Sequence, residues 1–121
     1  MKYLITGGAG FIGSNFIRFL FRERSDIDVV NLDALSYAGN LENLSEVMDN
    51  SRHTFIHGDI CNPETVAEAI KGVDVVVNLA AETHVDRSIH SDVHFVKTNV
   101  IGTATLLAKA LEAGVKRFVQ V

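Results

Sequence analysis

The sequence has little cysteine, proline or positive charge, and each shortage excludes a class of protein. A single cysteine, Cys61, among 121 residues rules out an internal disulfide, fits a reducing compartment, and is better read as a small buried residue than as a nucleophile. A net charge of −4 gives no electrostatic case for binding nucleic acid or an anionic membrane. With one proline and no linker or low-complexity tract, the chain has the composition of one globular domain over residues 1–121.

Long apolar runs are also missing. The longest lies near Val73–Ala81 and is interrupted by Asp74 and Asn78, well short of the roughly 20 residues that span a membrane. The N-terminus, MKYLITGG, has neither the apolar stretch nor the cleavage site of a signal peptide. We therefore expect a cytoplasmic protein without a membrane segment.

Metal-binding and catalytic patterns are absent from the sequence as well. His90 and His94 are four residues apart and His57 lies near the cysteine, but no CxxC or HExxH pattern accompanies them. We therefore expect no metal site. Neither Tyr3 nor Tyr37 is followed by lysine at the fourth position, so the chain shows no convincing general base for hydride transfer.

The sequence does contain an alternation of strand and helix patterns. Short apolar runs predict five strands, at Tyr3–Thr6, Val29–Asp33, Thr54–His57, Val73–Leu79 and Arg117–Val121. Alternating strands and helices predict a parallel sheet with right-handed crossovers, which is the doubly wound α/β fold of Rossmann type. In such sheets, ligands bind beyond the carboxyl ends of the strands.

Three helices are predicted between these strands. The first runs from Phe11 to about Arg24, and its apolar face is expected to carry Ile12, Phe16, Phe19 and Leu20. The second follows an N-cap at Asn62-Pro63 and ends near Gly72. The third runs from about Asp92 to Ala113 and closes at Gly114, with Val96, Val100, Leu107 and Leu111 on one side.

A glycine-rich stretch, TGGAGFIG, lies between the first strand and the first helix. Gly7, Gly10 and Gly13 are spaced three apart, and the GxGxxG dinucleotide pattern is also matched from the second glycine of the stretch. Such a loop needs glycine for a tight turn, for close approach to a pyrophosphate and for helix packing. The N–H groups of Phe11 and Ile12 would then face the phosphates. A plain glycine-rich turn is the alternative.

Asp33 ends the second predicted strand, 20 residues after Gly13. A carboxylate at this place in a dinucleotide site accepts hydrogen bonds from the adenosine ribose. It would repel a 2′-phosphate, and the segment from Ala34 to Asn40 has no Arg or Lys to neutralise one, which favours NAD over NADP. The alternative is that Asp33 caps a turn.

Further candidates follow the third and fourth strands. Asp59 is placed to meet the amino group of an adenine and Ile60 its face, although a turn acid explains Asp59 equally well. Leu79-Ala80-Ala81 are small enough for a cofactor to lie over them, as ordinary helix packing would also require. The loop AETHVDRS then gathers polar side chains at the same edge, and a solvated loop is the alternative there: Glu82, Thr83, His84, Asp86 and Arg87.

Together these stretches resemble a known family. TGGAGFIG, HGDI and NLAA are similar to motifs of the extended short-chain dehydrogenase/reductases, the NAD-dependent epimerases and dehydratases of nucleotide sugars. The loops LDALSYAGNLENL and AAETHVDRSI and the segment TNVIGTATLL look most like the dTDP-glucose 4,6-dehydratase family. The resemblance covers the whole chain.

The resemblance implies a site for NAD, with contacts that follow the cofactor from end to end. The pyrophosphate would lie beside the glycine loop with Phe11 and Ile12, the ribose beside Asp33, Ala34, Leu35 and Ser36, the adenine beside Asp59 and Ile60, and the nicotinamide half beside Leu79, Ala80, Ala81, Glu82 and Thr83. Thr98 would lie close to the cofactor, and Thr83 and His84 would reach the hexose of the substrate.

The resemblance also implies a reaction, the dehydration of dTDP-glucose to dTDP-4-keto-6-deoxyglucose. The family oxidises C4, eliminates water across C5–C6 and returns the hydride to C6, using a Tyr-x-x-x-Lys pair and an Asp-Glu pair. Those motifs are expected beyond Val121, so we expect no catalytic residue in this chain, a sheet incomplete at its C-terminal end, and no activity of the 121 residues alone. The full-length protein is expected to form a homodimer.

Two other functions stay open. A UDP-sugar 4-epimerase or another nucleotide-sugar dehydratase shares the glycine, HGDI and NLAA elements. A non-catalytic NAD-binding module would need no downstream motifs at all.

Overall fold

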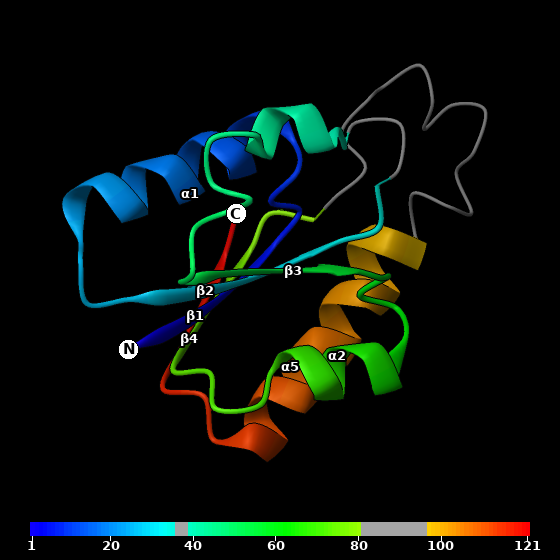
Figure 1. The fold of residues 1–121 in the computed structure, drawn as a ribbon. Helices are drawn as coiled ribbons and strands as arrows, with labels where there is room; N and C mark the ends of the chain where they lie inside the picture. Colours follow the sequence, from blue (N-terminus) through cyan, green and yellow to red (C-terminus); the bar gives the residue numbers. More distant parts are fainter. Residues whose placement is uncertain (36–38, 81–96) are drawn as a thin grey trace.

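The computed structural model describes residues 1–35, 39–80 and 97–121 of the chain (Figure 1). Within these residues, five parallel strands form one sheet in the order β3-β2-β1-β4-β5. The strands are β1 (Lys2–Thr6), β2 (Asp28–Asp33), β3 (His53–His57), β4 (Val75–Asn78) and β5 (Arg117–Gln120). β1 and β4, which are not consecutive in the chain, are neighbours in the sheet. Strands are added on one side of β1 up to β3 and on its other side from β4 onward, so the strand order reverses between β1 and β4. The predicted doubly wound α/β fold is confirmed.

Helices cover both faces of the sheet. In Figure 1, α1 (Phe11–Glu23) lies on one side, and α2 (Pro63–Ala69) and α5 (Thr103–Ala113) lie on the other. A 3₁₀ helix, η1 (Leu41–Leu44), follows β2, and a π-helix, η2 (Lys97–Gly102), leads directly into α5. The predicted caps are present: Asn62 Oδ1 accepts the backbone N–H of Glu64 at 3.0 Å, and Gly114 ends α5 with φ of 72°.

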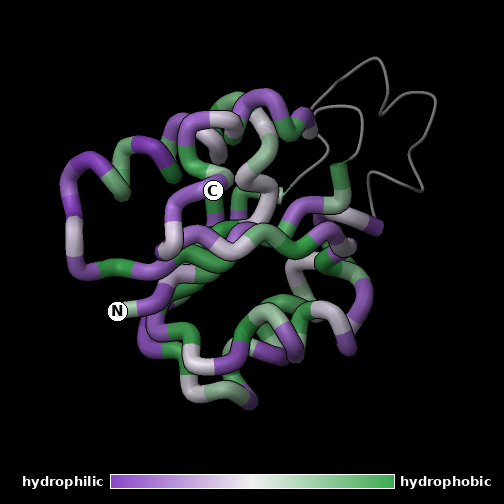
Figure 2. Tube along the Cα trace, viewed as in Figure 1, coloured by the Kyte–Doolittle hydropathy of each residue, from purple (hydrophilic) through white to green (hydrophobic). Residues whose placement is uncertain are grey.

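Two apolar cores result, one on each face of the sheet, because successive strand residues point to opposite faces. The core under α2 and α5 joins Leu4, Val30, Val76, Val66 and Leu106. The core under α1 joins Ile5, Val29, Val77, Ile17 and Leu44. Figure 2 shows the hydrophobic segments concentrated along the central strands and the hydrophilic ones on the outer turns.

The buried face of α1 agrees with the prediction at Leu20 and at Phe16, which packs against the core, and differs at the other two residues. Ile17 and Leu20 are buried, with Gly13 and Ser14 at the start of the same face, whereas Ile12 is 65% and Phe19 47% exposed. The face is rotated because Gly13 packs its backbone against the glycine loop, so the helix approaches the sheet through its smallest residues. The spacing of large apolar residues cannot predict a contact that is made by glycine.

The other helices also depart from the predicted bounds. The second ends at Ala69 and is capped at Ile70, although Gly72 does take the expected left-handed φ of 73°. The third is helical from Lys97 to Ala113, and its predicted start at 92–96 lies outside the described residues. Leu106 and Ala110 form its buried side, while Val100, Leu107 and Leu111 face outward. No helix in the described ranges is long and apolar enough to cross a membrane.

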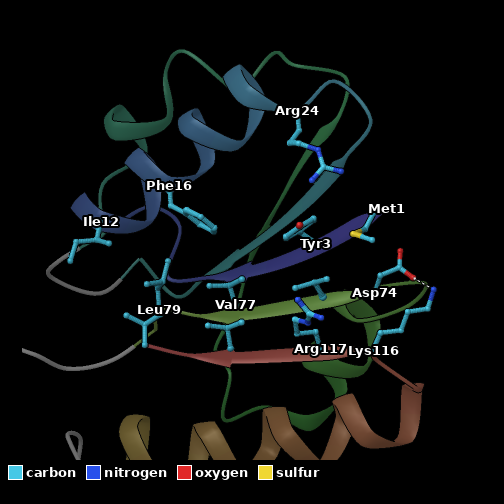
Figure 3. Close-up of a pocket in the computed structure, with 13 residues that line it drawn as sticks. Met1, Tyr3, Ile12, Phe16, Arg24, Asp74, Val77, Leu79, Lys116 and Arg117 are labelled. Atoms are coloured by element: carbon cyan, nitrogen blue, oxygen red, sulfur yellow. Dashed lines mark ion pairs between the residues drawn. The ribbon is translucent and has the colours of Figure 1, made fainter.

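An apolar groove runs along the α1 face of β1, β4 and β5, where no helix of the described residues covers the sheet (Figure 3). It has a volume of about 730 Å³. Ile12 and Phe16 of α1 form one side, and Tyr3 and Val77 of the strands form its floor. Val119 of β5 also lines the groove. An ion pair between Lys116 and Asp74, 3.6 Å long, lies at the end where the strands begin.

Candidate functional site

The carboxyl ends of the strands meet at one edge of the sheet, and backbone hydrogen bonds continue past them into the loops. The N–H of Gly7 donates to Leu32 O at 2.9 Å, and that of Leu79 donates to Thr6 O at 3.1 Å. The N–H of Gly58 donates to Asp33 O at 3.0 Å. The first residues after β1, β3 and β4 are therefore held to neighbouring strands at this edge, where the sequence predicts that the strand ends converge.

Gly7 and Gly13 are required by the fold of the glycine loop. Gly7 has φ of 71°, and a Cβ there would lie 2.8 Å from the backbone of Leu79 and Ala80. A Cβ at Gly13 would lie 2.3 Å from Gly7 O. The first glycine thus makes the turn against the exit of β4, and the last brings α1 onto the loop.

Gly10 differs from both Gly7 and Gly13, because a side chain there would not collide with the protein backbone but would fill an open space. A Cβ at Gly10 would meet only Gly7 O, at 3.4 Å, within the described residues. Gly10 is the N-cap of α1 and supplies no side-chain cap to the first turn. Phe11 and Ile12 follow with exposed fractions of 79% and 65%. The first N–H groups of a helix have no acceptor within the helix, so those of α1 can meet an anion.

Gly8 and its neighbours form a feature that sequence reasoning missed. A Cβ at Gly8 would lie 2.2 Å from Asn31 Oδ1, so Gly8 allows this buried amide to lie directly under the loop. Asn31 Nδ2 is 3.4 Å from His53 Nε2, and burial lowers the pKa of His53 below its ordinary value. The sequence does give one sign of this feature, because Asn31 is a polar residue within the apolar run Val29–Leu32.

Asp33 links the glycine loop to the end of β2. One carboxylate oxygen accepts the N–H of Ala9 at 2.8 Å, and the other accepts the N–H of Leu35 at 2.7 Å. The residue is buried, with 8% exposed. Asp33 therefore does cap a turn, as the alternative reading held. Each oxygen accepts one of these bonds, and a carboxylate oxygen can accept a second, so capacity remains for ribose hydroxyls.

The backbone after Asp33 is strained. Leu35 has φ of 54°, in the left-handed region that leucine rarely adopts. Its N–H bond to Asp33 and a contact between His57 Nε2 and Ala34 O, at 3.1 Å, hold the turn in place. Strain of this kind concentrates at ligand sites. Ser36 lies outside the described residues.

Asp59 and Ile60 occupy the loop after β3. Asp59 is exposed, and its Oδ1 accepts the N–H of Cys61 at 2.8 Å, which makes it a turn acid with one oxygen free of that bond. Ile60 is only 4% exposed and packs into the core against Gly102, so its side chain is not available as a flat face for adenine. Burial and Asp59 raise the pKa of the Cys61 thiol to about 11, so Cys61 stays protonated at neutral pH.

Leu79 and Ala80 lie half-buried beside Gly7, at the place predicted for the nicotinamide half of a cofactor. Thr98 lies in η2 and is half-buried. The other predicted contacts fall outside the described residues: Ala81, Glu82, Thr83 and His84, together with Asp86 and Arg87 of the same loop. His90 and His94 also lie there. Over 1–35, 39–80 and 97–121, no group of three or more His, Cys, Asp or Glu side chains is placed to hold a metal ion.

A five-stranded parallel sheet with a glycine loop opening α1 and an acid ending β2 defines a protein of the Rossmann α/β class. The chain belongs to the GDP-mannose 4,6-dehydratase family, whose model matches residues 4–121.

Curated relatives are about 50% identical to this chain over the segments that match it. The low-salt glycan biosynthesis protein Agl12 of Haloferax volcanii is 54% identical over the whole chain, which spans 39% of that protein. The dTDP-glucose 4,6-dehydratase of Streptomyces niveus is 46% identical over the whole chain, which spans 37% of it. The chain therefore spans less than two fifths of the length of these relatives.

Solved structures agree with the fold. DesIV, the dTDP-glucose 4,6-dehydratase of Streptomyces venezuelae, was determined with NAD bound. It matches 98% of this chain over 38% of its own, with a TM-score of 0.93 and 49% identity. A UDP-glucose 4-epimerase of Thermotoga maritima matches 99% of this chain over 37% of its own, with a TM-score of 0.87 and 34% identity.

Proposed function

We propose that this chain binds NAD along the carboxyl edge of its sheet. The observation that carries the proposal is the open face of Gly10 at the uncapped first turn of α1, with the Asp33 carboxylate at the next strand end. The pyrophosphate would lie against Gly10, Phe11 and Ile12, and the adenosine ribose against Asp33. DesIV, which is 49% identical, was solved with NAD.

The rest of the cofactor follows the neighbouring strand ends. The ribose would also meet Ala34, Leu35 and Ser36. Asp59 would accept a bond from the adenine amino group, and Ile60 would contribute backbone only, because its side chain is buried. Bound NAD⁺ supplies the acceptor for a hydride, and the residues that would flank its nicotinamide half are Leu79, Ala80, Ala81, Glu82, Thr83 and Thr98.

The charge at Asp33 predicts the choice of cofactor. A buried carboxylate repels the 2′-phosphate of NADP, and no Arg or Lys occurs from Ala34 to Asn40. We expect NAD to bind at least about tenfold more tightly than NADP, which corresponds to about 1.4 kcal/mol. Titration calorimetry of the purified full-length protein checks this preference.

Two variants test whether Asp33 causes the preference for NAD over NADP. Asp33→Asn would lose discrimination, because the amide carries no charge and cannot accept both N–H bonds. Asp26→Asn is the matched control, since Asp26 is exposed and pairs with Arg24 outside the site. Equal affinity for NAD and NADP in the unaltered protein would contradict the proposal.

For the full-length protein we propose a lyase activity, the dehydration of dTDP-glucose to dTDP-4-keto-6-deoxyglucose. Overall, hydrogen leaves C4, water is lost across C5–C6, and hydrogen arrives at C6. The support is the identity of 46–50% to dTDP-glucose 4,6-dehydratases from several bacteria. Thr83 and His84 are proposed to contact the hexose. The second candidate function is that of a UDP-sugar 4-epimerase, because the T. maritima UDP-glucose 4-epimerase is 34% identical to this chain.

We propose that these 121 residues are the cofactor-binding part of a longer enzyme and have no turnover by themselves. The relatives are two and a half to three times as long. The apolar groove over β1, β4 and β5 supports this proposal, since Val119 of β5 is 40% exposed and Ile12 of α1 is 65% exposed in it, and an apolar surface of this kind needs a cover. The remaining polypeptide would provide that cover, the substrate contacts and the catalytic base.

We also propose that the full-length protein is a homodimer of the cytoplasm. Ala104, Leu107, Ala108 and Leu111 are all exposed and, at helical spacing, form an apolar stripe along the outer side of α5. A two-fold pairing of this stripe would bury it against itself. The unpaired Cys61 fits a reducing compartment.

A further inference from the structure

The carboxyl ends of β1, β4 and β5 are joined by polar side chains on the α5 face of the sheet. Thr6, Asn78 and Gln120 are the last residues of these strands, and the strand register places them side by side. Thr6 Oγ1 lies 2.5 Å from Asn78 Oδ1, and Asn78 Nδ2 lies 2.8 Å from Gln120 Oε1. Thr6 and Asn78 are buried, with 0% and 1% exposed, whereas Gln120 lies at the exposed end of the row.

The backbone fixes which atoms donate and which accept. Thr6 Oγ1 accepts the N–H of Ala80 at 3.3 Å and that of Leu79 at 3.2 Å, the latter shared with Thr6 O at 3.1 Å, so the hydroxyl proton of Thr6 goes to Asn78 Oδ1. Asn78 Oδ1 also accepts the N–H of Ala80, at 3.3 Å. The amide nitrogen of Asn78 is therefore left to donate, and it needs acceptors of its own.

Two acceptors meet that nitrogen, and they differ in distance. Gln120 Oε1 is 2.8 Å away and Thr103 Oγ1 is 3.4 Å away. Thr103 gives its own proton to Asn99 O at 3.0 Å, which leaves its oxygen free to accept. Gln120 is thus the stronger partner of a buried amide, and losing it would leave an N–H without a close acceptor.

We propose that Gln120 is a positioning residue for the reaction. Its carbonyl oxygen holds Asn78, and Asn78 with Thr6 holds the N–H groups of Leu79 and Ala80, which flank the proposed nicotinamide site. The same bond ties the end of β5 to the exit of β4, next to the backbone bond from Val121 N to Asn78 O at 3.2 Å. This inference rests on the proposed function for its kinetic consequence, but not for its structural one.

The test uses the full-length protein and three variants. Gln120→Leu removes the acceptor, Gln120→Glu keeps an acceptor oxygen at the same reach, and Thr103→Val removes only the longer contact. We expect Gln120→Leu to lower kcat for dTDP-glucose by at least about tenfold while KM and the Kd for NAD change by less than about twofold. Gln120→Glu should restore kcat, and Thr103→Val should lower it less than Gln120→Leu does.

A second readout does not depend on activity. Hydrogen exchange followed by NMR should show faster exchange of the Leu79 and Ala80 amides and of the Asn78 side-chain NH₂ in Gln120→Leu, but not in Gln120→Glu. Unchanged exchange in Gln120→Leu would overturn the inference, as would equal losses in both Gln120 variants. If the unaltered protein does not convert dTDP-glucose, the proposed function fails, and the exchange data alone decide the role of Gln120.

Discussion

Gly10 and Gly13 lie three residues apart, yet a side chain at each would have opposite consequences. At Gly10, a methyl group would project into the space proposed for the pyrophosphate and touch only Gly7 O. At Gly13, it would strike the backbone of the loop, 2.3 Å from Gly7 O and 2.8 Å from Gly8 Cα. The first glycine is thus assigned to binding and the second to folding.

Alanine variants separate these two roles. We expect Gly10→Ala to keep its thermal midpoint and to raise the Kd for NAD at least about tenfold, because the ligand and the methyl group compete for one space. Gly13→Ala should lower the free energy of unfolding by about 1–3 kcal/mol, since backbone must shift. Thermal denaturation and calorimetry measure the two effects. Normal NAD binding by Gly10→Ala would contradict the assigned site.

We expect His53 to make the stability of the protein depend on pH. Burial lowers its pKa in the folded protein, so the unfolded chain takes up the proton first as the pH falls. The contribution is complete above pH 6.5 and is lost as the pH falls below that value. One proton changes the free energy of unfolding by at most about 1.4 kcal/mol per pH unit.

We therefore expect urea denaturation to show falling stability as the pH is lowered from about 6.5 to 5.5. His53→Gln should have a flatter profile over that range, because its amide does not titrate there. Asp26 and Asp74, whose pKa values are lowered by Arg24 and by the Lys2 backbone N–H respectively, lose their contributions only below about pH 4. Parallel profiles for the two proteins would show that His53 is not the group involved.

At the scale of the element, α5 has one buried side and one apolar exposed side. Leu106 and Ala110 face the sheet, while Leu107 and Leu111 are 47% and 85% exposed. The π-helix η2 precedes α5 and shifts the phase of the side chains between Lys97 and Thr103. A single predicted helix through this region therefore placed Val100 and Leu107 on a common side without showing which side is buried.

The exposed apolar stripe on α5 predicts which variants weaken the proposed homodimer. Leu107→Glu or Leu111→Glu should weaken the dimer of the full-length protein at least about tenfold, because two-fold pairing would bring like charges together in an apolar interface. Glu112→Gln on the same helix is the control and should leave assembly unchanged. Sedimentation velocity across a concentration series measures it. A dimer unaffected by either leucine variant would place the interface elsewhere.

The elements themselves were largely predictable, because each has a local cause. The apolar runs predicted every strand to within a few residues, and Asn62-Pro63 and Gly114 marked helix ends correctly. The buried face of α1 was only partly predictable from large apolar residues, since Gly13 and Ser14 make the closest approach. The 3₁₀ helix η1 was missed as well, because four residues carry no period.

At the scale of the whole molecule, the sequence predicted which strand ends converge but not how they are bonded. The glycine spacing and Asp33 indicated the site, and both lie at one edge. The bond from Ala9 to Asp33, the place of Asn31 under Gly8 and the burial of Ile60 depend on contacts between distant segments. Such contacts leave no periodic signal in the chain.

The groove along β1, β4 and β5 leaves part of one face of the sheet uncovered by the described residues. One face of the sheet is covered by α2 and α5, whereas the α1 face is covered only in part by the described residues. A sheet in this state fits the proposed role as one part of a longer enzyme, in which the rest of the polypeptide completes both the core and the active site.

We propose that the full-length protein moves hydrogen from C4 to C6 of dTDP-glucose. The most direct measurement is incubation of that protein with dTDP-glucose carrying deuterium at C4, followed by NMR and mass spectrometry of the sugar. We expect a 4-keto-6-deoxy product with deuterium at C6. Deuterium retained at C4 in an inverted sugar would establish an epimerase instead, and unchanged substrate beside bound NAD would leave only a binding module.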